Sequence, residues 1–98
     1  MSYERESYFK RILFLGCFEN NTKSKKNMIT GDNPSWHNVE NATICQVKYC
    51  QEYDKCKYFV YNIKTKSCNL KSEEAFAVRI HSAGYVFGPK FCEGQSLL

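Results

Sequence analysis

Residues 56–71 read CKYFVYNIKTKSCNLK and carry the clearest structural signal in the chain. Their first six residues combine aromatic and β-branched side chains, which strands favour. Residues 62–66 are polar and typical of a turn, and residues 67–70 follow as a second short strand. Cys56 begins the first strand and Cys68 lies in the second. The segment therefore predicts a β-hairpin with a cysteine in each arm.

A helix is predicted just before this hairpin, over residues 42–53. Asn41 is a suitable N-cap, because its side-chain oxygen can accept a hydrogen bond from a free amide of the first turn. A set of residues recurs at three- and four-residue spacing and so lines one face, which we expect to point toward the core. The set consists of Ala42, Cys45, Tyr49 and Tyr53.

The other segments are assigned from their composition. We expect a strand over residues 9–18, a polar loop over 19–38 with a short strand at 28–29, and a last strand over 85–87. With 98 residues, the chain has room for one domain. We place that domain at residues 9–92, with linker segments at 1–8 and 93–98.

The cysteine content is unusual: the chain has six, namely Cys17, Cys45, Cys50, Cys56, Cys68 and Cys92. An even number in a short chain is typical of a disulfide framework, since a small core leaves little margin against conformational entropy. Reduced thiols at this density would be unusual in the cytosol. Zinc is not expected, because the paired short spacings of zinc sites are missing and His37 and His81 lie far apart in the sequence. We therefore expect an oxidising compartment and no metal, with fifteen cysteine pairings open.

An exported protein needs a signal, and none is evident here. The apolar run at residues 12–15 is too short for a signal-peptide core or a membrane span. We therefore expect the signal outside this sequence. We interpret the chain as a domain of a longer secreted or surface protein that does not insert directly into a membrane.

Three blocks of residues, taken in order, resemble the apple or PAN module. The first is the predicted helix with Cys45 and Cys50, followed by Cys56. The second is similar to the family's Cys-x-x-Phe-x-Tyr strand at residues 56–61, with residues 68–71 matching Cys-x-Leu-Lys. The third, Gly-Pro-Lys-Phe-Cys at residues 88–92, is similar to the close of apple modules in apicomplexan microneme adhesins. Together the blocks span residues 17–92.

The resemblance implies an α+β fold: a small disulfide-rich domain with a curved antiparallel sheet and one helix packed across it. It also implies a nested set of disulfides. The implied pairs are Cys17–Cys92, Cys45–Cys68 and Cys50–Cys56.

Two positions depart from the family pattern. The helix cysteines usually stand four apart, whereas Cys45 and Cys50 stand five apart, which on a regular α-helix separates them by about 140°. Either the helix loosens near Tyr49, or Cys50 lies beyond its regular part. Phe87 also stands where a small residue usually precedes Gly-Pro.

No constellation of catalytic residues is evident, so we expect no enzymatic activity and no cofactor. The adjacent acids Glu73 and Glu74 are interpreted as part of a solvated turn. Trp36 and His37 form the most site-like dipeptide, because an indole and an imidazole on a loop could stack on a sugar ring. The favoured alternative is that Trp36 fills the core beneath the loop.

Lysines give a second lead to a ligand. Lys23, Lys25 and Lys26 cluster in the polar loop, and four further lysines bracket the hairpin, namely Lys55, Lys57, Lys64 and Lys66. The net charge of +4 is modest, so a nucleic-acid partner is not expected in an exported module. A sulfated glycan or an acidic protein surface suits such a surface better, with the three clustered lysines as principal contacts. The alternative is a lysine-rich surface that only confers solubility.

The resemblance implies an adhesive, carbohydrate-binding or protein-binding module that acts in host-cell attachment. It also implies a secreted or cell-surface location, which microneme adhesins reach through an apical secretory organelle. The alternatives are a structural or assembly spacer, and a docking module accessory to a protease. Asn20 and Asn41 each begin a glycosylation sequon. We expect Asn20 to be the acceptor and Asn41 to resist, because Asn41 is predicted to cap the helix.

Overall fold

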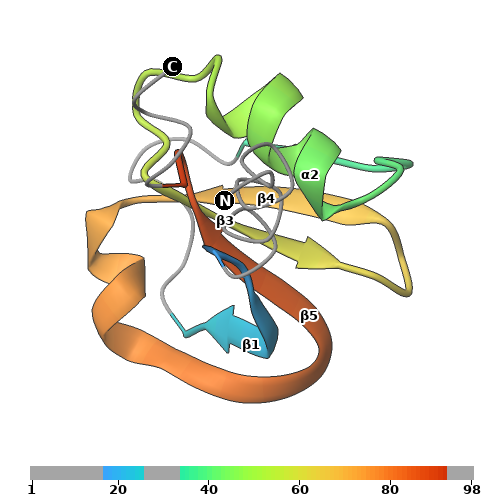
Figure 1. Cartoon of the computed structure of the whole chain (residues 1–98), viewed down its shortest axis with the longest axis vertical. Helices are drawn as coiled ribbons and strands as arrows, with labels where there is room; N and C mark the ends of the chain where they lie inside the picture. The colour runs from blue at the N-terminus through green and yellow to red at the C-terminus, as the bar shows by residue number, and fades with distance from the viewer. Residues whose placement is uncertain (1–16, 26–33, 93–98) are drawn as a thin grey trace, which may run out of the picture.

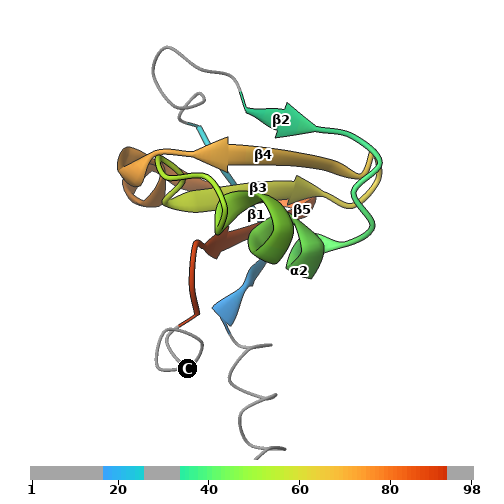
Figure 2. The same ribbon diagram turned by 90° about the horizontal axis from the view of Figure 1, so that it is seen from above.

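The computed structural model describes residues 17–25 and 34–92. Within these residues the strands form one five-stranded antiparallel sheet in the order β1-β5-β3-β4-β2, and the helix that begins at Ala42 lies across one face (Figures 1 and 2). This is the α+β architecture expected from the sequence. The strands are β1 (Glu19–Ser24), β2 (Ser35–Trp36), β3 (Tyr58–Asn62), β4 (Ser67–Lys71) and β5 (Arg79–Pro89).

The predicted hairpin forms the centre of the sheet. β3 and β4 pair in register from Tyr58 opposite Lys71 to Asn62 opposite Ser67. The side-chain oxygen of Asn62 accepts hydrogen bonds from the backbone amides of Lys64 and Thr65, which holds the turn. The expected hairpin is confirmed, but its first strand begins at Tyr58, so Cys56 precedes the arm in which it was expected and only Cys68 lies in a strand.

Side chains alternate between the two faces of this hairpin. Phe59 and Tyr61 of β3, with Leu70 of β4 and Val86 of β5, are buried against the helix. Val60 and Phe87 belong to a second, smaller cluster on the opposite side. We call the surface on that side the far face.

The helix departs from a regular α-helix where the sequence raised the question. α2 (Ala42–Ile44) continues directly as a π-helix, η1 (Cys45–Cys50), in which the Gln51 amide donates to the Gln46 carbonyl five residues earlier. A π-turn holds one more residue than an α-turn, so Cys45 and Cys50 can both be buried in one core. The helix therefore loosens, which is the first of the two alternatives predicted from the spacing of Cys45 and Cys50. It ends at Cys50, earlier than the expected residue 53.

All six cysteines are paired as the resemblance implied. Cys17–Cys92 joins the start and the end of the described fold, Cys45–Cys68 joins the helix to β4, and Cys50–Cys56 joins the end of the helix to the residues before β3. No cysteine is free.

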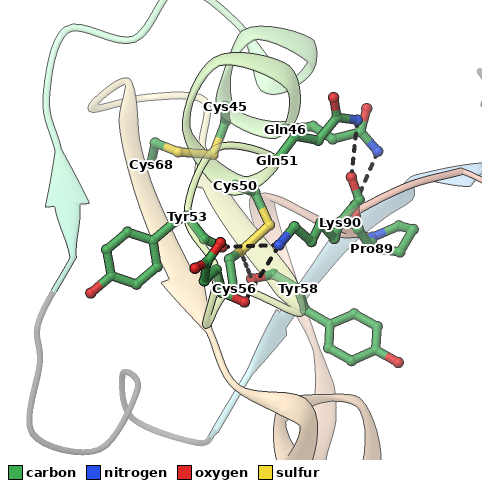
Figure 3. The surroundings of a disulfide bond; sticks show 11 residues. Cys45, Gln46, Cys50, Gln51, Tyr53, Cys56, Tyr58, Cys68, Pro89 and Lys90 are labelled. Carbon is green, nitrogen blue, oxygen red and sulfur yellow. Dashed lines mark hydrogen bonds between the residues drawn. A yellow bond between two sulfur atoms is a disulfide. The ribbon is translucent and has the colours of Figure 1, made fainter.

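The closing segment after β5 is fixed by the end of the helix (Figure 3). The Gln46 side-chain amide donates to the Pro89 carbonyl, and the Gln51 side-chain amide donates to the Lys90 carbonyl. The Lys90 ammonium in turn donates to the Tyr53 carbonyl at 3.0 Å. Gly88 is required here, since a Cβ at this position would lie 2.6 Å from the ring of Phe59. The Gly-Pro-Lys motif therefore closes the fold through hydrogen bonds in which backbone carbonyl groups are the acceptors.

Several expectations for the flanking segments were wrong. The polar loop expected over residues 19–38 contains β1 and β2, and the last strand begins at Arg79 rather than at residue 85. β1 is an edge strand whose Asn20 and Asn21 are exposed, so it lacks an apolar pattern. β5 bends at Gly84, whose φ is +87°. The backbone amide of Gly84 donates a hydrogen bond to Oδ1 of Asn21. Figure 1 shows the resulting arc of β5 around β1.

Three smaller expectations remain. Glu73 and Glu74 are exposed as expected, but they begin a 3₁₀ helix, η2 (Glu73–Val78), rather than a turn. Cys17 and Phe18 are not in a strand, and the rest of the strand expected over residues 9–18 lies outside the described residues. The short strand expected at 28–29 also lies outside them. None of the helices in the described part of the chain is long and apolar enough to cross a membrane.

Candidate ligand-binding surface

The far face is organised by a row of stacked side chains. The ring of Phe87 stacks on Tyr58 with centroids 5.2 Å apart, and Tyr58 stacks on Phe76 at 5.6 Å. The guanidinium of Arg79 lies 3.7 Å above the ring of Phe76 and forms an ion pair with Glu19 at 2.5 Å. Phe76 belongs to the helical segment at residues 73–78, and among the described residues it is the only ring of that segment that stacks on another. Its contacts with Tyr58 and Arg79 therefore hold this segment against the sheet.

Two lysines approach this aromatic row. The Lys23 ammonium lies 5.0 Å from the centroid of the Tyr85 ring, a cation–π contact between β1 and β5. Lys71 stands opposite Tyr58 in the β3–β4 pair and is only 8% exposed. Burial lowers the pKa of Lys71, and the positive charge of Lys23 lowers it further.

The lysines expected as ligand contacts do not form one patch. Lys23 reaches the far face, Lys25 is exposed after the end of β1, and Lys26 lies outside the described residues. The four hairpin lysines are all exposed, but they fall at its two ends. Lys55 and Lys57 precede β3, whereas Lys64 and Lys66 lie in the turn before β4.

Trp36 and His37 lie at the other edge of the sheet. The indole of Trp36 is half-buried, packs against the core beside the helix and stacks on Tyr49 with centroids 4.6 Å apart. Tyr49 thereby covers one face of the indole, as in the core-filling alternative. The imidazole of His37 is exposed, and its Nδ1 lies 3.2 Å from the Ser67 hydroxyl. The structure therefore does not bring these two residues together with Lys23.

Tyr85 and Lys71 were missed as candidate site residues, although a signal for Lys71 was present. The implied disulfide from Cys68 to Cys45 of the helix places Cys68 on the helix side of the sheet, and period-2 alternation then places Leu70 on the same side and Lys71 on the other face. Tyr85 could not be linked to Lys23 from sequence, because β1 was expected to be a loop.

An open groove lies beside this row, at the junction of η2, β1 and β5. It has a volume of about 500 Å³ and is lined by Thr22, Phe76, Ala77, Arg79, Ile80 and His81. Phe76 and Ile80 are 46% and 36% exposed. Among the described residues no group of three His, Cys, Asp or Glu side chains could hold a metal ion.

Comparison with known proteins gives a consistent result. A model of the PAN domain family matches residues 17–92. The chain is also similar to the two N-terminal apple domains of Toxoplasma gondii microneme protein 4, with a TM-score of 0.61 and 22% sequence identity. The match covers 74% of this chain and 44% of that one, so the chain spans less than half of the two-domain structure. A comparison with curated proteins gave no match. Because the family model spans all six cysteines, the central hairpin and the closing segment, this chain belongs to the PAN domain family.

Proposed function

We propose that this chain is an extracellular adhesive module, not an enzyme, and that it binds sulfated glycans on a cell surface. Its PAN domain fold supports a binding role, since this family serves as binding modules. Three disulfides suit a secreted or surface protein. By analogy with the microneme adhesin of similar fold, it would reach the surface through an apical secretory organelle and act in host-cell attachment.

The observation that carries the proposal is the position of Lys23. Of the two lysines of the expected cluster that the structure describes, it is the one that lies over an aromatic ring, 5.0 Å from the centroid of Tyr85. An ammonium is a compact charge that binds sulfate without strict geometry. Lys25, exposed one residue after β1, can add to the same positive surface.

Heparin affinity chromatography tests the proposal. We compare the parent chain with a Lys23, Lys25, Lys26→Ala variant and with a matched variant, Lys48, Lys57, Lys64→Ala, which loses the same charge elsewhere. The parent should elute at higher salt than the first variant, while the matched variant should stay close to the parent. If both variants eluted at the same salt concentration, Lys23, Lys25 and Lys26 would contribute only to solubility and not to a specific site.

A second candidate is a docking module for a protein partner, either in assembly or beside a protease. The exposed apolar side chains of Phe76, Val78 and Ile80 next to the groove favour it. A glycan array separates the two candidates. Sulfated hits that disappear in the Lys23, Lys25, Lys26→Ala variant support glycan binding. An array without any acidic hit favours the docking module.

A further inference from the structure

The groove at the junction of η2, β1 and β5 has the size and the lining of a site for one sugar residue. Its volume of about 500 Å³ is typical of small-molecule sites. Part of its lining is apolar and part can form hydrogen bonds. The apolar residues are Phe76, Ala77 and Ile80, and the polar ones are Thr22, Arg79 and His81. A sugar ring offers the matching combination, since its C–H groups are apolar and its substituents are polar.

The guanidinium of Arg79 is held in place in the absence of a ligand. Its central carbon lies 3.7 Å from the centroid of the Phe76 ring, and its Nε donates to the Phe76 carbonyl at 2.7 Å. Phe76 is itself fixed, because its ring stacks on Tyr58. A ligand that binds Arg79 therefore does not have to order this long side chain, which lowers the entropic cost of binding.

The same guanidinium already binds a carboxylate. Its Nη1 forms an ion pair with Glu19, and the two side chains are 33% and 42% exposed. Exposed ion pairs of this kind contribute little to stability, so a ligand carboxylate can compete with Glu19. Among the described residues the hydrogen bonds of Arg79 use Nε and Nη1 only, and Nη2 carries further N–H donors. Glu19 thus shows which chemical group Arg79 accepts.

The rest of the groove suits the ring that carries such a carboxylate. The Thr22 hydroxyl donates to a backbone carbonyl of β1, so its oxygen remains an acceptor for a sugar hydroxyl. The two faces of the Phe76 ring are covered by Tyr58 and Arg79, which prevents a sugar from stacking on it. Apolar contacts come from its exposed edge and from Ile80. Recognition therefore depends on Arg79 and not on aromatic stacking.

The groove adjoins the lysines of the proposed glycan-binding surface. Thr22 precedes Lys23 on β1, and Lys23 is paired with Ile80 in the β1–β5 ladder. The backbone amide of Lys25 donates to the carbonyl of Val78, the residue before Arg79. Side chains of paired strands start about 5 Å apart. One glycan chain can therefore contact the groove and the lysines together.

We propose that the groove is the uronate subsite of this surface: it binds one uronic acid residue, whose carboxylate accepts hydrogen bonds from Arg79, while sulfate groups on neighbouring sugars contact Lys23 and Lys25. The inference rests on the proposed glycan-binding function and names a sugar that it recognises. A carboxylate is assigned because its planar shape matches the guanidinium, and because Arg79 already pairs with one in the folded chain. Phe76 acts on the ligand through Arg79 and is a positioning residue.

Titration calorimetry with heparin and with carboxyl-reduced heparin tests the subsite, because the reduction removes the uronate carboxylates and keeps the sulfates. The parent chain should bind the reduced form about fivefold more weakly, as expected for the loss of one exposed charge pair. Arg79→Lys keeps the charge but removes the planar fork, so it should weaken the binding of heparin about threefold and leave that of the reduced form unchanged. Phe76→Leu should have the same selective effect.

Two further variants sharpen the comparison. Glu19→Gln removes the internal competitor of the ligand, so it should strengthen the binding of heparin about threefold and that of the reduced form less. Lys64→Arg, a charge-conserving change at the exposed hairpin turn, is the control and should alter neither affinity.

The outcomes separate this inference from the function on which it rests. No binding of heparin by the parent chain would overturn the proposed function itself. Equal affinity of the parent for both forms of heparin would overturn only the uronate subsite. An equal loss of both affinities in Arg79→Lys would also overturn it, since the arginine would then serve sulfate binding or the fold. Glu19 lies outside both hydrophobic clusters, so Glu19→Gln tests the subsite even if Arg79→Lys does not fold. An unchanged heparin affinity in Glu19→Gln would contradict the competition at Arg79.

Discussion

Asn41 shows how one side chain serves the fold and constrains a modification. Its Oδ1 accepts a hydrogen bond from the Ile44 amide at 2.9 Å, as predicted from the sequence. The same residue begins the sequon Asn41-Ala42-Thr43, which is folded into the first helical turn. Removing such a cap costs about 1 kcal/mol of stability. A glycan on Asn41 would crowd the turn that its side chain holds.

We therefore predict that Asn20 is glycosylated and Asn41 is not. Asn20 is exposed on the edge strand β1, two residues before Thr22, whose hydroxyl is on the accessible side of the strand and donates to the Asn20 carbonyl. Glycopeptide mass spectrometry after expression in a glycosylating host measures both sites. An Asn20→Gln variant should lose all glycan mass. Full occupancy at Asn41 alone would contradict the prediction.

Lys71 gives a pH-dependent prediction. Its pKa in the folded chain lies below the ordinary value of 10.5, because of burial and of Lys23. Between the lowered pKa and 10.5, the unfolded chain binds more protons than the folded one, so this group makes stability rise with pH in that interval. Below the lowered pKa, Lys71 is charged in both the folded and the unfolded chain, and the folded chain is destabilised by the full free-energy cost of the buried charge. Lys71→Met should therefore be more stable than the parent at pH 7, by an amount that shrinks as the pH approaches 10.5.

Calorimetric melting of both chains at pH 7 and at pH 10 measures this difference. Burial and the charge of Glu40 raise the pKa of Tyr61, so both folded chains lose stability as the pH rises above 10. This contribution is the same in the two chains and cancels when their melting temperatures are subtracted. Lys64→Met, at an exposed site, serves as the control and should show no such trend. A melting-temperature gap between Lys71→Met and the parent that stays constant with pH would contradict the assignment.

Among the elements, the helical segment shows what a single extra residue does. Two buried cysteines five positions apart cannot both face the core on a regular α-helix. The π-turn over Cys45–Cys50 absorbs the additional residue, and the Gln46 side chain is still placed to donate to the Pro89 carbonyl. The local irregularity accommodates the cysteine spacing.

Deletion of Val47 should convert this π-turn into an α-turn. Val47 is 41% exposed and lies between the two cysteines, so its loss restores a four-residue spacing without emptying the core. We expect the same three disulfides and a change in unfolding free energy below about 1 kcal/mol. Peptide mapping and thermal melting measure both. Deletion of Thr43, which is exposed in the α-helical part, is the control and should be strongly destabilising. If both deletions lowered the unfolding free energy equally, the π-turn would be required for stability and not only to accommodate the cysteine spacing.

The elements that sequence could predict are those whose pattern reflects burial. β3 and β4 alternate between a buried helix side and the far face, so their strands and their turn were recovered. β1 and the first half of β5 pair mainly with one another at the sheet edge, and most of their residues are polar and at least partly exposed. Their pairing depends on backbone hydrogen bonds, which leave no apolar period in the sequence.

At the scale of the whole molecule, the candidate site was predictable only in part. A basic cluster around Lys23 was visible in the sequence, and its neighbourhood was not. The contact of Lys23 with Tyr85 joins β1 to β5, two strands that are far apart in the sequence and that the sheet order makes neighbours. Tertiary juxtaposition of this kind has no local sequence signature.

The disulfides divide the stability of the molecule unequally. In the chain-entropy model, the bond between Cys17 and Cys92, which closes a separation of 75 residues, contributes about 4.5 kcal/mol, whereas Cys50–Cys56, with a separation of 6, contributes about 2 kcal/mol. Either figure is large against the 5–15 kcal/mol that is typical of whole domains. Removal of the outer bond as a Cys17, Cys92→Ala pair should therefore lower the unfolding free energy more than removal of the inner pair.

Urea titration of the two double variants compares these contributions, and their m-values report whether the unfolded chain has expanded. The outer variant should show the lower midpoint and the larger m-value, since its unfolded chain is freed over a longer loop. Its surface around Lys23 should still bind heparin below the melting temperature, because Lys23 and Tyr85 are held by the sheet and not by this bond. If the inner variant proved the less stable of the two, loop closure in the unfolded chain could not be the main contribution. The buried contacts of Cys50 and Cys56, both fully inaccessible to solvent, would then account for the stabilisation instead.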